Sequence, residues 1–168
     1  VKEWDEDTCT FAAWKGHLDC LRYAHENGCP WGKQVYSMAA LNGNLDCLKY
    51  IREHGGPKMC SKKACNSAAE GGHLDCLKFV HEQGCSLNST TCESAAEHGN
   101  LDCLKYVHEN GCPWDERVYI LAIQYGHLNC LKYAYENGCP FNGINFQEAC
   151  HYGHPDCVQY IKEQGFPC

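Results

Sequence analysis

The sequence has no apolar segment that approaches the length of a membrane-spanning helix, which needs about 20 consecutive apolar residues. Of its 168 residues, 44% are hydrophobic and 21% are charged, and polar residues interrupt every apolar stretch. The chain also lacks the basic and then apolar start of a signal peptide. We therefore expect an intracellular, cytoplasmic protein without a membrane partner.

Positive charge is scarce in this chain. It carries 14 Lys and Arg residues against 21 Asp and Glu residues, which gives a formal net charge of −7. The electrostatic field of this net negative charge would repel a phosphate backbone. The basic cluster of Lys58, Lys62 and Lys63 is too short to indicate a nucleic-acid site. We therefore expect no nucleic-acid partner.

Motifs for catalysis are also missing. The sequence holds no glycine-rich phosphate loop, no nucleophile-elbow pattern and no pair of acidic residues at a fixed spacing. The histidines that recur before a leucine (His17, His73 and His127) are replaced by Asn44 and Asn100 in other copies of the same segment. This exchange favours a capping or inter-repeat hydrogen-bonding role over a general base. The sequence therefore predicts a protein without enzymatic activity.

One segment, residues 99–111, is repeated along the whole chain. It begins Gly-Asn-Leu-Asp-Cys-Leu, and close copies begin at Gly16, Gly43, Gly72, Gly126 and Gly153. The steps between successive copies are 27, 29, 27, 27 and 27 residues. A fixed period of this size indicates stacked repeats, in which each unit buries its apolar face against its neighbours.

The repeated segment has the features of a short helix. In the first copy, His17 stands at the N-cap, Leu18 is the first helical residue and Gly28 ends the helix. The sixth copy supports this register, because Pro155 replaces the leucine and proline is favoured at the first helical position. A helix of about nine residues is too short to be stable alone. It therefore needs neighbouring helices.

Another recurring feature lies before each glycine. It is a pair of small or apolar residues: Ala12-Ala13, Ala39-Ala40, Ala68-Ala69, Ala95-Ala96, Ala122-Ile123 and Ala149-Cys150. Alanine is the best helix former, and its small size lets helices approach closely. We therefore expect a first helix before each glycine, and a turn such as Cys29-Pro30-Trp31 that leads into the next repeat.

The junction Ala-Ala-x-x-Gly-His-Leu, at Ala12 to Leu18 and again at Ala68 to Leu74, resembles the ankyrin repeat. The resemblance covers essentially the whole chain and implies an all-α, ankyrin-like α-solenoid of six helix-turn-helix repeats. The period of 27 is shorter than the usual value of about 33, so we expect tight turns in place of the β-hairpin fingers. In style the sequence resembles short, cysteine-rich ankyrin arrays of large DNA viruses and protists, and a viral protein would lie in the host cytoplasm.

The predicted boundaries follow from the period. We expect a single ankyrin-like repeat domain over residues 1–168, with units at about 5–31, 32–60, 61–87, 88–114, 115–141 and 142–168. Neither end carries a recognisably polar capping repeat, although solenoids need such caps. The expectation is therefore a monomer, or a segment of a longer array.

Cysteine is abundant, with 16 residues. Most cysteines recur with the repeat, at positions where a helix buries a small apolar side chain. This pattern favours reduced thiols in the core over a disulfide framework.

A zinc site is the alternative use of these cysteines. Cys76, His81, Cys85 and Cys92 have residue types that could close a tetrahedral site. Against it, Cys76 and His81 lie about 140° apart around a helix, and other repeats lack part of the set. We therefore expect that no cofactor is required, and zinc is the alternative.

The repeats differ from one another at adjacent positions near the end of the first helix. The candidate partner-binding residues there are Trp14, Lys15, Leu41, Asn42, Glu70, Glu97, His98, Gln124, Tyr125, His151 and Tyr152. The family resemblance implies that the first helices line a concave binding face. Varied aromatic and polar side chains on a constant frame suit recognition of a protein, because Trp and Tyr often dominate affinity. Neutral change at exposed positions is the other interpretation.

These observations together predict a scaffold or adaptor that binds another protein through the concave, inner-helix face. The alternative function is a zinc-stapled structural or metal-binding repeat array that uses Cys and His ligands.

Overall fold

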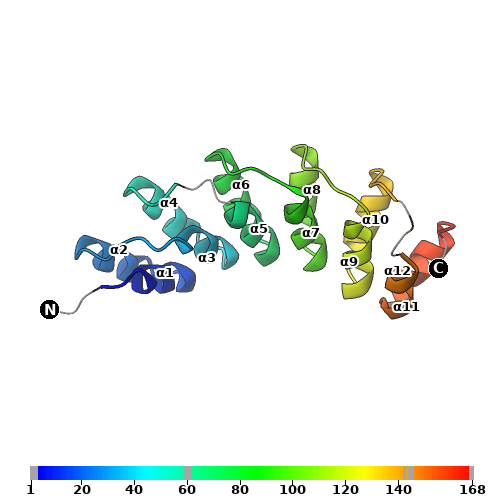
Figure 1. The fold of residues 1–168 in the computed structure, drawn as a ribbon, viewed down its shortest axis with the longest axis horizontal. Coiled ribbons are helices and arrows are strands. Elements are labelled where there is room, and N and C mark those ends of the chain that lie inside the picture. Colours follow the sequence, from blue (N-terminus) through cyan, green and yellow to red (C-terminus); the bar gives the residue numbers. More distant parts are fainter. Residues whose placement is uncertain (1–3, 59–61, 142, 144–145, 167–168) are drawn as a thin grey trace. The chain divides into compact units, whose positions relative to one another are not determined.

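A computed structural model describes residues 4–58, 62–141, 143 and 146–166. Within these residues the regular secondary structure is helical, with no strand. The first helices of the six repeats are α1 (Glu6–Lys15), α3 (Val35–Leu41), α5 (Lys62–Gly71), α7 (Ser89–Glu97), α9 (Arg117–Tyr125) and α11 (Phe146–Tyr152). The second helices are α2 (Leu18–Glu26), α4 (Leu45–Glu53), α6 (Leu74–Glu82), α8 (Leu101–Glu109), α10 (Leu128–Glu136) and α12 (Pro155–Glu163). The predicted all-α fold of six helix pairs is confirmed (Figure 1).

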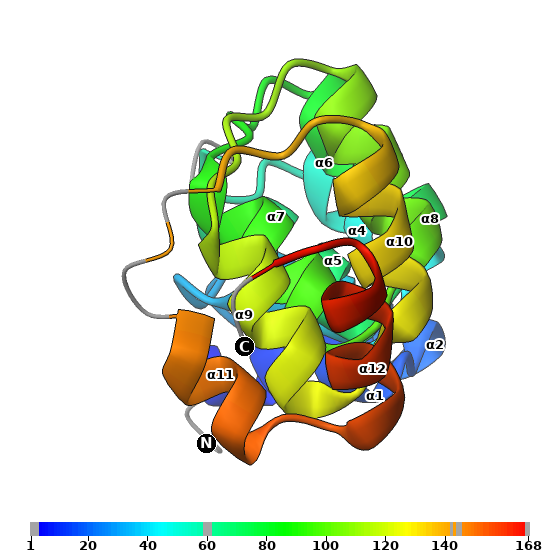
Figure 2. The same ribbon diagram turned by 90° about the vertical axis from the view of Figure 1, so that its right-hand side faces the viewer.

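The chain divides into two compact units, residues 1–87 and 88–168, and each unit holds three helix pairs. In the first unit, α3 contacts both α1 and α5, and α4 contacts both α2 and α6. In the second unit, α9 contacts α7 and α11, while α10 contacts α8 and α12. Each unit therefore has a row of first helices and a row of second helices, as Figure 2 shows for α8 and α10 beside α7 and α9. The predicted single domain with its repeat boundaries stays a prediction.

The short period is accommodated in the turns between helix pairs. Between α2 and α3, the chain from Asn27 to Gln34 forms turns and irregular backbone without a strand. Gly28 has φ +87°, a left-handed conformation that glycine adopts without strain. The backbone N–H of Cys29 donates to the carbonyl of Ala24 (3.0 Å) and closes the helix end. Tight turns thus replace the β-hairpin fingers in the described residues, as predicted.

In the first unit, the second helix pair is tied to the first pair at the glycine that follows α1. Gly16 has φ +71°, and a Cβ atom placed on it would lie 2.5 Å from Oδ1 of Asn44. The Nδ2 atom of Asn44 donates hydrogen bonds to the carbonyls of Ala13 (2.8 Å) and Trp14 (2.9 Å). These carbonyls lie at the C-terminal end of α1, where the last carbonyl groups of a helix have no N–H partner within the helix. The predicted inter-repeat hydrogen-bonding role is therefore confirmed at Asn44.

The same junction recurs in the second unit with histidine in place of asparagine. His127 lies at the N-cap of α10 but makes no side-chain hydrogen bond to that helix. Its Nε2 atom is instead 2.9 Å from the carbonyl of Glu97 at the end of α7. A Cβ atom on Gly99 would lie 2.4 Å from Nδ1 of this imidazole. A larger residue than glycine would therefore displace the histidine from the helix end.

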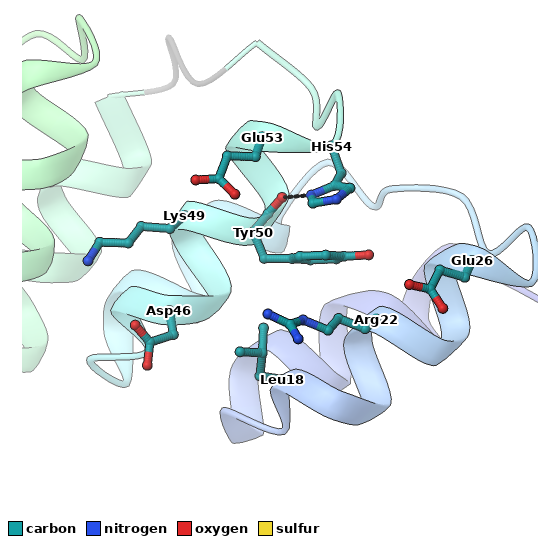
Figure 3. A pocket seen from close by; sticks show the side chains of 8 residues that line it. All are labelled: Leu18, Arg22, Glu26, Asp46, Lys49, Tyr50, Glu53 and His54. Carbon is teal, nitrogen blue, oxygen red and sulfur yellow. Dashed lines mark hydrogen bonds between the residues drawn. The ribbon is translucent and has the colours of Figure 1, made fainter.

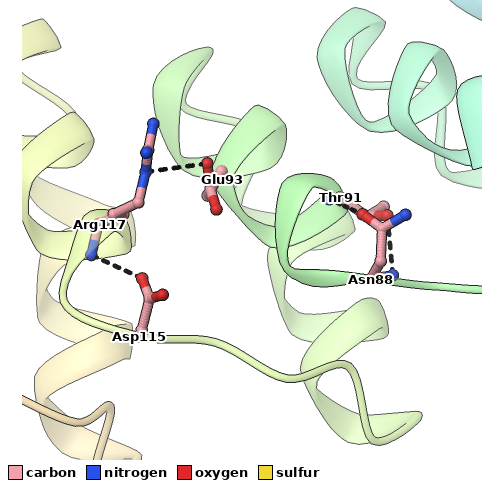
Figure 4. Close-up of polar contacts among 5 residues, drawn as sticks. All are labelled: Asn88, Thr91, Glu93, Asp115 and Arg117. Carbon is pink, nitrogen blue, oxygen red and sulfur yellow. Dashed lines mark hydrogen bonds and ion pairs between the residues drawn. The ribbon is translucent and has the colours of Figure 1, made fainter.

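Local hydrogen bonds determine where the first helices of the second unit begin (Figure 4). The side chain of Asn88 accepts from the N–H of Thr91 (3.2 Å), and the Thr91 hydroxyl accepts from the N–H of Asn88 (3.3 Å). Before α9, Asp115 accepts from the N–H of Arg117 (2.9 Å). The Nε atom of Arg117 also pairs with Glu93 on α7 at 3.1 Å. The N-cap of α7 formed by Asn88 contributes about 1 kcal/mol to stability.

The core of each unit consists of small and branched apolar side chains. On α4 of the first unit, Cys47, Leu48 and Ile51 are at most 1% exposed, and Cys130 and Leu131 on α10 of the second unit are fully buried. Because neighbouring repeats cover these faces, short helices become stable in the stack. Among the residues that the structure describes, every helix is too short or too polar to span a bilayer.

We expect the substitution Asn44→Ala to lower the free energy of unfolding by about 1–3 kcal/mol, because two half-buried helix-end carbonyls lose their donor. Urea denaturation followed by circular dichroism measures this loss. The matched control is Asn27→Ala, since the Nδ2 atom of Asn27 donates to the Tyr23 carbonyl (2.8 Å) at an exposed helix end. The control should lose less than half as much. Equal losses would contradict a special role of the inter-repeat bond.

Candidate partner-binding surface

The variable positions lie at the C-terminal ends of the first helices, and none of the predicted residues is buried. In the first unit, Lys15, Asn42 and Glu70 are exposed, whereas Trp14 and Leu41 are half-buried. In the second unit, the exposed residues are His98, Gln124, Tyr125, His151 and Tyr152, and Glu97 is half-buried. The structure thus leaves all eleven side chains accessible to a partner.

An aromatic platform lies on α1 of the first unit, formed by Phe11, Trp14 and Lys15. The ring centroids of Phe11 and Trp14 are 5.5 Å apart. The ammonium group of Lys15 is 3.8 Å from the Trp14 ring centroid and 5.6 Å from that of Phe11. Phe11 is 57% exposed. Phe11 is not among the binding residues predicted from the sequence, although its position one helical turn before Trp14 is a usable signal.

Two tyrosines dominate the corresponding surface of the second unit. Tyr125 is 51% exposed and Tyr152 is 73% exposed, and both end first helices that contact one another, α9 and α11. The imidazole of His151 lies against Tyr152 at a centroid distance of 4.6 Å and an interplanar angle of 87°. His98, at the end of α7, has its Nδ1 atom 3.0 Å from the Ser94 carbonyl. This end of the helix row therefore presents aromatic and polar groups together.

A charged groove on the second helices of the first unit was not predicted from the sequence. It has a volume of 510 Å³ and is lined by Leu18, Arg22, Glu26, Asp46, Lys49, Tyr50, Glu53 and His54 (Figure 3). Tyr50 stacks on His54 with centroids 4.0 Å apart, and the guanidinium carbon of Arg22 lies 5.5 Å from the Tyr50 ring. Burial raises the pKa of Tyr50, and the nearby carboxylate of Glu26 raises it further. The lining holds no Ser, Thr or Cys nucleophile.

A mostly apolar groove of 540 Å³ lies beside the aromatic platform. Its lining residues are Trp4, Thr8, Phe11, Ala12, His17, Asp19, Cys20, Tyr23 and Ala24. Trp4 meets Tyr23 edge to face at 6.2 Å, and Tyr23 is 63% exposed. Because Phe11 belongs to both features, the groove is an alternative site for a partner on the first unit.

The four predicted zinc ligands fall in two different units. Cys76 and Cys85 are buried in the first unit, where His81 is half-buried on α6, and Cys92 lies buried on α7 of the second unit. The part of the chain that the structure describes contains no group of three or more His, Cys, Asp or Glu side chains that could hold a metal ion. The zinc alternative therefore gains no support from the geometry.

The cysteine of the Leu-Asp-Cys triplet is a core residue in most repeats. This position is at most 1% exposed at Cys47, Cys76, Cys103, Cys130 and Cys157, whereas Cys20 is exposed. Burial raises the pKa of Cys47 to about 11 and that of Cys130 to about 12. These thiols are therefore neutral and behave as small hydrophobic groups. Cys150 departs from the expectation of reduced thiols, because its sulfur is in a disulfide.

Comparison with known proteins agrees with this architecture. The sequence profile for "Ankyrin repeats (3 copies)" matches residues 9–91 and 92–167. The chain belongs to the ankyrin repeat family. The crystal structure of the human ASB11 ankyrin repeat domain is similar over 94% of this chain and 83% of that chain, with a TM-score of 0.76 and 16% sequence identity. At this identity the likeness shows the fold alone. No curated protein sequence matches the chain.

Membership of the ankyrin repeat family confirms the resemblance carried by the Ala-Ala-x-x-Gly-His-Leu junction. Ankyrin repeats are in general protein–protein interaction modules without enzymatic activity. The predicted class of protein-binding scaffold agrees with this general property.

We expect an aqueous thiol reagent at neutral pH to label Cys20 well before Cys47 and Cys130. Cys20 is exposed, whereas burial keeps the thiolate fraction of the other two small. Peptide mass spectrometry at successive times measures the rate at each cysteine. In a Cys20→Ser control the rates at Cys47 and Cys130 should not change. Labelling of the buried cysteines as fast as Cys20 would show that the repeats open readily.

Proposed function

We propose that this ankyrin repeat protein is a scaffold or adaptor that binds a protein partner through the C-terminal ends of its first helices. The observation that carries the proposal is the placement of all eleven variable residues in exposed or half-buried positions at the same helix end. The paired small residues that precede them in the repeat, such as Ala12 and Ala13, are buried, and the Ala13 carbonyl is engaged in the junction between repeats. The repeats therefore differ mainly at positions where a substitution has little effect on the stability of the fold.

The aromatic residues of each unit are the proposed anchors. In the first unit, the half-buried Trp14 ring contacts the Phe11 ring and the ammonium group of Lys15, which limits the entropy that it would lose on binding. In the second unit, Tyr125 and Tyr152 present large exposed rings from adjacent helices. Trp and Tyr are the residues most often found at the energetic centre of protein interfaces.

The remaining features of the proposal follow from composition and from the cysteines. The net charge of −7 opposes a nucleic-acid partner. The many buried thiols suit a reducing compartment, so we place the protein in the cytoplasm, or in the host cytoplasm for a viral source. The proposed binding requires no cofactor and assigns no chemical step to the chain. We propose that it acts as a monomer or as a segment of a longer array.

We expect Trp14→Ala, and separately Tyr125→Ala combined with Tyr152→Ala, to weaken capture of a partner by at least about tenfold, since an interface anchor contributes about 2 kcal/mol or more. The purified chain is immobilised, exposed to a cell lysate, and the captured proteins are quantified by mass spectrometry. Circular dichroism of each variant confirms that the helices remain folded.

The matched control is Tyr23→Ala, which removes an equally exposed tyrosine from the second helix α2 and from the apolar groove. This variant should capture the same proteins as the unmodified chain. If instead Tyr23→Ala loses a partner that the helix-end variants retain, the apolar groove is the binding site and the helix-end proposal is wrong.

A further inference from the structure

Three repeats contain a pair of cysteines 20 residues apart, one on the first helix and one in the turn after the second helix. The pairs are Cys9 with Cys29, Cys65 with Cys85, and Cys92 with Cys112. In the third pair the two thiols form a hydrogen bond, and in the first pair the Cys9 thiol lies 3.9 Å from the carbonyl oxygen of Cys29. The other three repeats hold Tyr36 with Gly56, Tyr119 with Cys139, and Phe146 with Phe166 at the same positions. The Cys92–Cys112 pair is therefore one of three places where the sequence puts two cysteines at these positions of a repeat.

The pair in the second unit has the closest described contact between thiol sulfurs. The Sγ atoms of Cys92 and Cys112 are 2.9 Å apart, about 0.9 Å longer than a disulfide bond of about 2.0 Å. Cys92 is fully buried, and Cys112 is 5% exposed. Cys112 Sγ is also 2.9 Å from the carbonyl of Asn88, the N-cap of α7. Both sulfurs therefore lie where the start of α7 meets the turn after α8.

The next repeat allows a comparison, because it has Cys139 in the turn but Tyr119 in place of the cysteine on the first helix. Cys139 Sγ lies 3.1 Å from the carbonyl of Asp115, and the Tyr119 hydroxyl donates to the Cys139 carbonyl (3.0 Å). Burial raises the pKa of Cys139 to about 12. In contrast, the hydrogen bond from the Cys92 thiol lowers the pKa of Cys112. Pairing thus favours a thiolate at Cys112 and not at Cys139.

We propose that Cys92 and Cys112 form a dithiol site that reacts with a low-molecular-weight disulfide of the glutathione class to give an intra-repeat disulfide. The Cys112 thiolate attacks one sulfur of the small disulfide, whose S–S bond breaks, and the first small thiol leaves with the proton that Cys112 released. The Cys92 sulfur then attacks Cys112 Sγ. The protein S–S bond forms, and the second small thiol leaves with the proton of Cys92. Two cysteines are oxidised while one small disulfide is reduced to two thiols.

The new bond would join the start of α7 to the turn after α8 within one repeat. It replaces the thiol hydrogen bonds of Cys112, and it limits the freedom of the unfolded chain between residues 92 and 112. The reagent reaches Cys112 when the turn opens locally, because this cysteine is the more exposed of the two. The reaction therefore makes the repeat that carries Glu97 and His98 more resistant to unfolding.

The test treats the full reduced chain with oxidised glutathione, blocks the remaining thiols by alkylation and maps peptides under non-reducing conditions. We expect a cross-linked peptide pair that contains Cys92 and Cys112 and lacks the mass of two hydrogen atoms. Cys139 should be recovered alkylated and serves as the internal control. Recovery of Cys92 and Cys112 as unlinked peptides, or linked to other cysteines instead, would overturn the proposal.

A second measurement separates the site from a general effect of oxidation. The thermal midpoint of the wild-type chain should rise after treatment, whereas Cys92→Ala should show the same midpoint before and after. In Cys92→Ala the reaction should stop at a glutathionyl group on Cys112. A midpoint that rises equally in both proteins would also count against the site. If the alanine variant does not fold, Cys112→Ala gives the same comparison.

Discussion

The stack depends on one hydrogen-bonded contact, in which a side chain from one repeat reaches the open end of the first helix of the preceding repeat. Asn44 supplies two donors to the end of α1, and His127 lies at the last carbonyl of α7. Helices of seven to ten residues gain little from their own hydrogen bonds. The residue between the two helices must be glycine, because a Cβ atom at this position would clash with the Asn or His side chain. Within each unit, the pairing of glycine with His or Asn therefore determines how one repeat joins the next.

This contact also explains why the helix ends can vary. The junction uses the backbone carbonyls of the last helical residues and leaves their side chains unconstrained. Trp14 is an example. Its carbonyl accepts a hydrogen bond from Asn44, while its ring makes a cation–π contact with the ammonium group of Lys15. Stability and recognition therefore use different atoms of the same residue. A varied surface on a constant frame is the physical basis of the adaptor function that we propose.

The cysteines have two separate roles in this frame. Those of the Leu-Asp-Cys triplet are neutral, buried core groups, as Cys47 and Cys130 illustrate. Those of the turns hold the start of the first helix, because the thiols of Cys112 and Cys139 lie at the carbonyls of Asn88 and Asp115. The second role brings Cys112 close to Cys92, and so the same turn that shortens the repeat creates a dithiol pair.

The sequence by itself determined the repeat period, the two helices of each repeat, the glycine positions and the membership of the ankyrin repeat family. These features are encoded by neighbours along one helix or by identical residues one period apart. Only the tertiary structure decided that Phe11 joins Trp14 on the surface, that the described residues contain no group of three metal-ligating side chains, and that Cys92 meets Cys112. The reason is that contacts between a helix and a distant turn depend on the path of the turn and on the packing of whole helices, which periodicity does not report.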